Sequence, residues 1–155
     1  MLSLTKKSEY ALVAICHLAN SAEKVVSARD IAEQHLVPLP LLMNVLKSLN
    51  QRELISSVRG ARGGYRLAVD PAAVTLAAVI EAIEGPVRLV PCAPGTGGEH
   101  RACERMHMCT LRRPLHRVHE AFREFLSCVT IADLAFDDQN NTGGASAPAC
   151  KVAAQ

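Results

Sequence analysis

Residues 54 to 68, "LISSVRGARGGYRLA", place two strand-like stretches on either side of a glycine-rich centre. Tyr65, Leu67 and Val69 alternate with other residues, which is the period of a strand with one buried face. The segment "GARGG" (60–64) suits the tip of a hairpin. The sequence therefore predicts two strands, over 54–60 and 65–70, joined by a tip that carries arginines and glycines.

Three helices are predicted before this hairpin. Thr5 can cap a first helix that runs to Asn20, and Ser27 can cap a short second helix over "ARDIAEQH" (28–35). The turn "LVPLP" leads to a third helix, "PLLMNVLKSLNQREL" (40–54), whose apolar residues recur at helical spacing. A short helix, a tight turn, a longer helix and a hairpin are the pattern of a winged helix-turn-helix.

The rest of the chain predicts a fourth helix over 72–85, a cysteine-containing loop, a long helix over 110–130 and a short helix over 131–136. Thr110 is the expected cap of the long helix. The apolar stripe along this helix favours dimerisation over intramolecular packing. We thus expect a mainly α protein with a small β-hairpin, a winged helix-turn-helix plus a long dimerisation helix. The expected units are a DNA-binding domain (1–84), a cysteine loop (85–110), a dimerisation part (111–136) and a disordered tail (137–155).

Composition and motifs exclude several classes of protein. No apolar run approaches the length of a membrane span, and the N-terminus lacks the order of a signal peptide, so we expect a cytoplasmic protein without a membrane partner. The chain has no nucleophilic triad, and "GARGGYR" lacks the spacing of a phosphate loop, so we do not expect an enzyme.

The basic residues favour double-stranded DNA as a partner. Net charge is only +2, yet residues 47 to 66 contain five Lys or Arg against one Glu. Such a stripe on a nearly neutral chain is a candidate phosphate-binding surface, although a solvated basic face is the alternative. The expected DNA-contacting residues lie at the start of the second helix, on the third helix and in the hairpin: Ser27, Arg29, Pro38, Pro40, Leu41, Asn44, Lys47, Arg59, Arg62, Gly63 and Gly64.

Three cysteines lie in the loop that follows the fourth helix. Ten residues separate Cys92 from Cys103, and five separate Cys103 from Cys109. Clustered thiolates in a Gly- and Pro-rich loop suit a soft metal site, an iron–sulfur cluster or zinc. Three thiolates leave room for a fourth ligand, for which the chain offers His100, His107, Glu99, Glu104 and, farther away, Glu9.

The strings "LTKKSEYAL", "SARDIAEQHLVP", "VLKSL" and "LISSVRGARGGYRLA" resemble the IscR/NsrR family of bacterial transcriptional regulators over about residues 1 to 136. The resemblance implies a homodimer that binds a pseudo-palindromic operator. It also implies an iron–sulfur cluster on cysteines placed like Cys92, Cys103 and Cys109.

The fourth ligand in that family differs between branches. The acidic residue of the nitric-oxide-sensing branch matches Glu9, which would reach the cluster of the partner subunit. The histidines used by two other branches would fall at Arg112 and Val13, so neither matches. The ten-residue gap is wider than the family's usual spacing, and it leaves the cluster type, 2Fe–2S or 4Fe–4S, open.

The functional hypothesis is a DNA-binding transcriptional repressor whose operator affinity depends on an iron–sulfur cluster that senses nitric oxide, redox state or iron–sulfur status. The alternative is a cluster-free regulator that uses the cysteines as a thiol switch or a zinc site.

Overall fold

The computed structural model describes residues 3–21, 24–60, 62–89 and 108–136 of the 155-residue chain. The elements are α1 (Lys6–Asn20), α2 (Ala28–Gln34), α3 (Leu39–Gln51), β1 (Ile55–Val58), β2 (Gly64–Leu67), the 3-10 turn η1 (Pro71–Ala73), α4 (Leu76–Glu84), α5 (Arg112–Cys128) and α6 (Ile131–Phe136). The two strands form an antiparallel sheet, in which Ile55 pairs with Leu67 and Val58 with Gly64. The expected fold class, mainly α with one hairpin, is confirmed.

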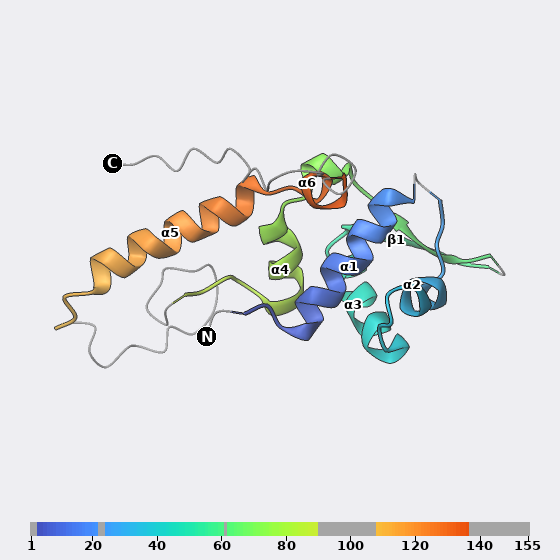
Figure 1. Cartoon of the computed structure of the whole chain (residues 1–155), viewed down its shortest axis with the longest axis horizontal. Helices are drawn as coiled ribbons and strands as arrows, with labels where there is room; N and C mark the ends of the chain where they lie inside the picture. Colours follow the sequence, from blue (N-terminus) through green and yellow to red (C-terminus); the bar gives the residue numbers. More distant parts are fainter. Residues whose placement is uncertain (1–2, 22–23, 61, 90–107, 137–155) are drawn as a thin grey trace, which may run out of the picture.

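The arrangement places the helix-turn-helix and its hairpin at one end of the molecule (Figure 1). α1 runs through the middle and packs against α3, α4 and α6. Its buried face meets the predicted apolar face of α3, since Leu42, Val45, Leu46 and Leu49 are all buried. α5 extends away from the hairpin towards the opposite end.

Side-chain caps fix the starts of several helices. The Thr5 hydroxyl accepts from the backbone N–H of Ser8 at 3.3 Å, and the Ser27 hydroxyl accepts from Asp30 N–H at 3.1 Å. Both caps were expected from the sequence and are confirmed. Thr130 and Asp133 form a reciprocal cap at the start of α6, where Thr130 N–H donates to the Asp133 carboxylate at 2.8 Å and Asp133 N–H to the Thr130 hydroxyl at 3.2 Å.

Two expected helix starts are wrong. The fourth helix begins at Leu76 rather than 72, because Thr75 caps it through Ala78 N–H and the residue before it is extended. Val74 and Leu76 exchange backbone hydrogen bonds with the segment between α5 and α6, through Ile131 N–H and the Val129 carbonyl, both at 2.8 Å. The long helix begins at Arg112 with Leu111 at its cap position, so Thr110 is not the cap.

The helix-turn-helix turn is closed by backbone hydrogen bonds typical of a Schellman motif. Val37 N–H donates to the Ala32 carbonyl at 2.9 Å, and Leu36 takes a left-handed conformation with φ 53°. The same motif ends α3, where Glu53 has φ 59° and Leu54 N–H donates to the Leu49 carbonyl at 3.1 Å. α3 therefore ends at Gln51, three residues before its expected end.

Candidate nucleic-acid interface and cysteine site

Two backbone hydrogen bonds connect the hairpin to the segment that precedes α2. Val26 N–H donates to the Tyr65 carbonyl at 2.9 Å, and Tyr65 N–H donates back to the Val26 carbonyl at 2.8 Å. This bridge joins the start of β2 to the residue before the Ser27 cap. It fixes the position of the hairpin relative to the helix-turn-helix.

The glycines of the hairpin allow this close packing, because a side chain at their positions would meet backbone atoms. A Cβ on Gly64 would overlap the Val26 carbonyl oxygen and lie 2.7 Å from its carbonyl carbon. A Cβ on Gly63 would meet the Val58 and Gly60 carbonyl oxygens, and Gly60 itself has φ +127°. The close approach that Gly63 and Gly64 permit is thus made by the chain's own backbone, and their expected contact with DNA stays a prediction.

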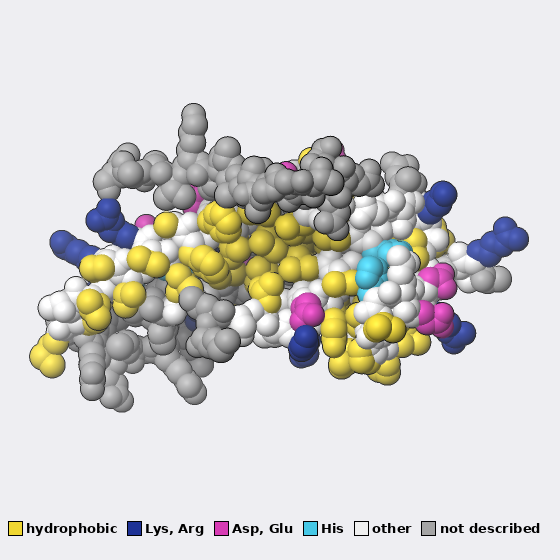
Figure 2. Space-filling model, in the orientation of Figure 1, with side chains coloured by type: hydrophobic (Ala, Val, Ile, Leu, Met, Phe, Trp, Pro, Cys, Tyr) yellow, Lys and Arg dark blue, Asp and Glu magenta, His cyan; other side chains and the backbone are white. Residues whose placement is uncertain are grey.

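The hairpin presents two exposed guanidinium groups. Arg59 and Arg62 lie beside its tip, where neither has an acidic partner among the residues that the structure describes. Arg66, in contrast, donates through Nε to the Ser56 hydroxyl at 3.2 Å across the two strands. Figure 2 shows basic side chains projecting at the far end of the hairpin.

The other expected DNA-contacting residues gather beside the hairpin. Pro38, Pro40, Leu41, Asn44 and Lys47 are exposed on the first turns of α3. At the start of α2 the side chain of Arg29 is exposed, while the Ser27 hydroxyl is already used as a cap. The structure therefore brings these residues to one end of the molecule (Figure 1), and their contact with DNA stays a prediction.

The cysteine loop lies mostly outside the described residues, including Cys92 and Cys103. Cys109 is half-buried, free of a disulfide and three positions before the start of α5. Within the described ranges, no group of three or more His, Cys, Asp or Glu side chains is close enough to hold a metal ion. The proposed ligand set is thus represented here by Cys109 and Glu9 alone.

Glu9 lies in the first turn of α1 with an exposed carboxylate. Its partner is the Lys6 ammonium at 2.7 Å, and the Lys6 side chain is itself largely exposed. An ion pair between two exposed side chains contributes little to stability, because water screens it and two long side chains must be ordered. Glu9 is therefore accessible to another partner at small cost.

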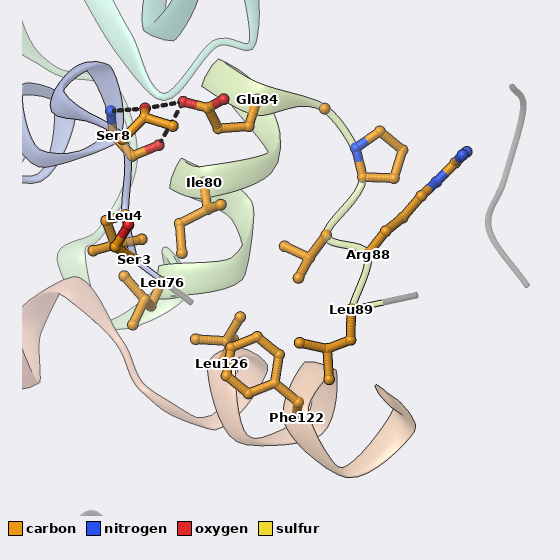
Figure 3. A pocket seen from close by; sticks show the side chains of 14 residues that line it. Ser3, Leu4, Ser8, Leu76, Ile80, Glu84, Arg88, Leu89, Phe122 and Leu126 are labelled. Atoms are coloured by element: carbon orange, nitrogen blue, oxygen red, sulfur yellow. Dashed lines mark hydrogen bonds between the residues drawn. The ribbon is translucent and has the colours of Figure 1, made fainter. Parts of the chain in front are cut away.

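A cavity of about 500 Å³ connects the start of α1 with the segment that leads to the cysteine loop. Its walls come from residues 3–5, α4, residues 85–89 and α5, and they are mostly apolar (Figure 3). On its rim, the Glu84 carboxylate accepts from the Thr5 hydroxyl and from the buried Ser8 hydroxyl, the latter at 3.1 Å. Glu84 is the last residue of α4, so this contact links the base of the cysteine loop to α1.

Sequence reasoning missed Glu84, Ser8 and Val26. Glu84 stands at the end of a predicted helix, and nothing in the local sequence marks a partner 76 residues away. No sequence pattern marks Val26 either, because a single β-bridge produces no alternation of buried and exposed residues.

Comparison with known proteins decides the family. A family model described as "Rrf2: Iron-dependent Transcriptional regulator" matches residues 4–137. The chain belongs to the Rrf2 family. It is accordingly a transcriptional regulator, and the expectation that it is not an enzyme is confirmed.

Individual Rrf2 relatives support this assignment. The chain is 34% identical to the HTH-type transcriptional regulator NsrR of Geobacillus kaustophilus, over 88% of this chain and 91% of the relative. The structure of CymR, the global cysteine regulator of B. subtilis, is similar with a TM-score of 0.69 at 30% identity, covering 87% of this chain and 97% of that one. The structure of T. potens IscR gives the same TM-score at 26% identity, covering 92% and 94%. The expected resemblance to IscR and NsrR regulators is confirmed.

Among the described residues, no helix is long and apolar enough to span a membrane.

Proposed function

We propose that this Rrf2 protein is a homodimeric repressor that binds a pseudo-palindromic DNA operator through α3 and the hairpin. The observation that carries the proposal is the common placement of the exposed side of α3 and of Arg59 and Arg62 at one end of the molecule. Helix-turn-helix proteins insert the second helix into the major groove, while basic side chains beside it bind phosphates. A paired copy would present two such ends to two half-sites.

We further propose that Cys92, Cys103 and Cys109 hold an iron–sulfur cluster, with Glu9 of the partner subunit as the fourth ligand. When bound, such a cluster would supply a centre that reacts with nitric oxide or oxidants and that depends on iron supply. The thiol of Cys109 and the carboxylate of Glu9 fit as donors, since one is free and half-buried and the other is exposed. The family's description as iron-dependent supports the same interpretation.

The contacts of this chain suggest how the cysteine loop influences DNA binding. Glu84, at the base of the loop, holds the start of α1 through Thr5 and Ser8. α1 packs against α3, so a shift of α1 alters the position of the DNA-binding helix. A signal that rearranges the loop would therefore change operator affinity by favouring one arrangement of the two halves of the dimer.

The proposed dimer rests on α5. Leu111 at the cap position and Val118 and Phe125 along the helix are exposed, while Leu126 packs against α4. A row of exposed apolar side chains on a 17-residue helix is suited to a second copy of the same helix. Sedimentation of the full chain tests the dimer, and a monomer at micromolar concentration would contradict it.

DNA binding is tested on the promoter region beside the protein's own gene. We expect the double variant Arg59→Ala and Arg62→Ala to bind this fragment more weakly and to reduce the magnitude of the slope of log affinity against log salt by about 3.6, because the dimer loses four phosphate contacts and each contributes about 0.9. Arg123→Ala removes one charge from α5, which extends away from the hairpin, and should leave the slope unchanged. An unchanged slope in the double variant would contradict the assignment of the hairpin.

A cluster-free regulator is the second candidate. The structural similarity to CymR, which is described as a global cysteine regulator, allows this alternative. The free, half-buried thiol of Cys109 is compatible with it. In that case the cysteines act as a thiol switch or a zinc site, and the protein purified without oxygen is colourless.

A further inference from the structure

The exposed side of α3 is uncharged over its first two turns. Residues 38 to 46, "PLPLLMNVL", contain no Lys, Arg, Asp or Glu, and Asn44 is the one exposed residue among them whose side chain carries hydrogen-bonding groups. Leu41 is 43% exposed and Met43 44% exposed. Figure 2 shows apolar side chains gathered at this end of the molecule, over α2 and α3.

The start of α3 also offers little to a phosphate group. Pro38 and Pro40 have no N–H, and the Leu41 N–H already donates to the Pro38 carbonyl at 3.0 Å. The usual anion-binding property of a helix start is therefore weakened here. Exposed cations that can bind phosphate are present instead at Arg29, Lys47, Arg59 and Arg62. The start of α3 is therefore better suited to contact with base edges.

Each base pair presents a different surface in the major groove. Guanine is usually read by Arg or Lys and cytosine by an acidic side chain, and the first two turns of α3 have neither. Adenine offers N6 as donor and N7 as acceptor, which match the carboxamide of Asn. Thymine offers an apolar 5-methyl group, which matches Leu and Met.

We propose that the start of α3 reads A·T base pairs, with the Asn44 amide on an adenine and Leu41 and Met43 on thymine methyl groups. The inference rests on the proposed function, because it requires α3 to enter the major groove. Leu41 and Asn44 lie one turn apart on α3 and border the same hollow of about 190 Å³, which Lys7 of α1 and Ile83 of α4 also line. In the described part of the chain, the Asn44 amide forms no hydrogen bond that would withhold it from a base, since only its backbone carbonyl is engaged, by the Ser48 hydroxyl.

The first step of the test is selection of bound duplexes from a randomised library by the full-length protein. We expect an enriched pair of half-sites with A·T pairs at the positions that methylation interference or cross-linking assigns to α3. G·C pairs at these positions would overturn the inference while leaving the proposed function intact. Absence of any enriched sequence would instead remove the proposed function, and the inference with it.

The second step removes single groups from the enriched duplex. Deoxyuridine in place of thymidine removes only the 5-methyl group, and each contacted methyl should then weaken binding about fourfold, equivalent to about 0.8 kcal/mol. 7-Deaza-adenine removes the N7 acceptor and should weaken binding about fivefold or more at the adenine that Asn44 reads. Unchanged affinity for both modified duplexes would overturn the proposal.

Variants assign these effects to side chains. Leu41→Ala with Met43→Ala should abolish the penalty for deoxyuridine while keeping the penalty for 7-deaza-adenine, and Asn44→Ala should do the reverse. The matched control is Leu134→Ala on α6, a leucine with a similar exposure of 42%, which should keep both penalties. Because all four residues are exposed, the variants should fold, and circular dichroism verifies this. Penalties that persist unchanged in the α3 variants would contradict the inference.

Discussion

Replacing Gly64 with alanine is expected to loosen the hairpin from the helix-turn-helix. The new methyl group would overlap the Val26 carbonyl, and backbone atoms cannot move aside as a flexible side chain does. The two strands would have to separate from Val26, which breaks the pair of hydrogen bonds between Val26 and Tyr65 at 2.8 and 2.9 Å.

The expected loss follows from these two bonds. Each backbone hydrogen bond contributes about 1 kcal/mol net, so the pair contributes about 2 kcal/mol. Alanine restricts the unfolded chain and offsets about 0.4–1 kcal/mol of this loss. The free energy of unfolding should therefore fall by about 1–2 kcal/mol, which lowers the melting temperature by about 3–6 °C.

Thermal unfolding followed by far-ultraviolet circular dichroism measures the change. Ser57→Ala is the control, because Ser57 is exposed on the neighbouring strand and the substitution adds no atoms there. A Gly64→Ala protein that melts at or above the wild-type temperature would refute the argument that this glycine is needed for contact with Val26.

Three further substitutions or conditions test other parts of the structure. Burial lowers the pKa of His119 below its usual value, and the nearby Arg123 and His116 contribute to the shift. As the pH drops below about 6.5, the unfolded chain therefore takes up the proton first, and the free energy of unfolding should fall. Urea titrations at different pH values measure this dependence, which a His119→Leu variant should flatten. Leu36→Gly should leave the free energy of unfolding unchanged or raise it by up to about 1 kcal/mol, because Leu36 is 90% exposed and has φ 53°, a conformation that glycine adopts without strain. Chemical denaturation measures the change, and a loss of more than about 1 kcal/mol would be evidence against strain at this turn. Glu84→Ala should lower the free energy of unfolding by about 1–3 kcal/mol, because the buried Ser8 hydroxyl loses its acceptor. Glu84→Gln keeps an acceptor oxygen and should lower the free energy of unfolding by less. Equal losses in the two variants would exclude this explanation.

Local signals predicted much of the fold. Thr5 and Ser27 are oxygen-bearing side chains placed before apolar-periodic segments, and both cap helices as expected. The four apolar residues of α3 recur at helical spacing and are all buried. The hairpin could be predicted because alternating apolar residues and turn-forming glycines occur together within 15 residues.

Features that depend on distant partners were not predictable in the same way. α4 begins at Leu76 because Val74 pairs with Ile131, more than 50 residues away, and no local pattern marks this pairing. Leu36 and Glu53 end helices in left-handed conformations without the glycine that usually signals such an end. In the candidate site, the sequence predicts that α3 and the hairpin contribute to one DNA-binding surface. The contacts of Val26 and Glu84 depend on tertiary packing, which no local pattern marks.

The proposed function depends on an iron–sulfur cluster that is held by the cysteines and controls DNA binding. Its most direct test is the visible absorption spectrum of the full-length protein purified without oxygen, combined with iron and sulfide counts and compared with the Cys109→Ser variant. We expect a brown protein that contains iron and acid-labile sulfide, both of which are lost in the Cys109→Ser variant. A colourless wild-type protein, whether it contains zinc or no metal, would contradict it.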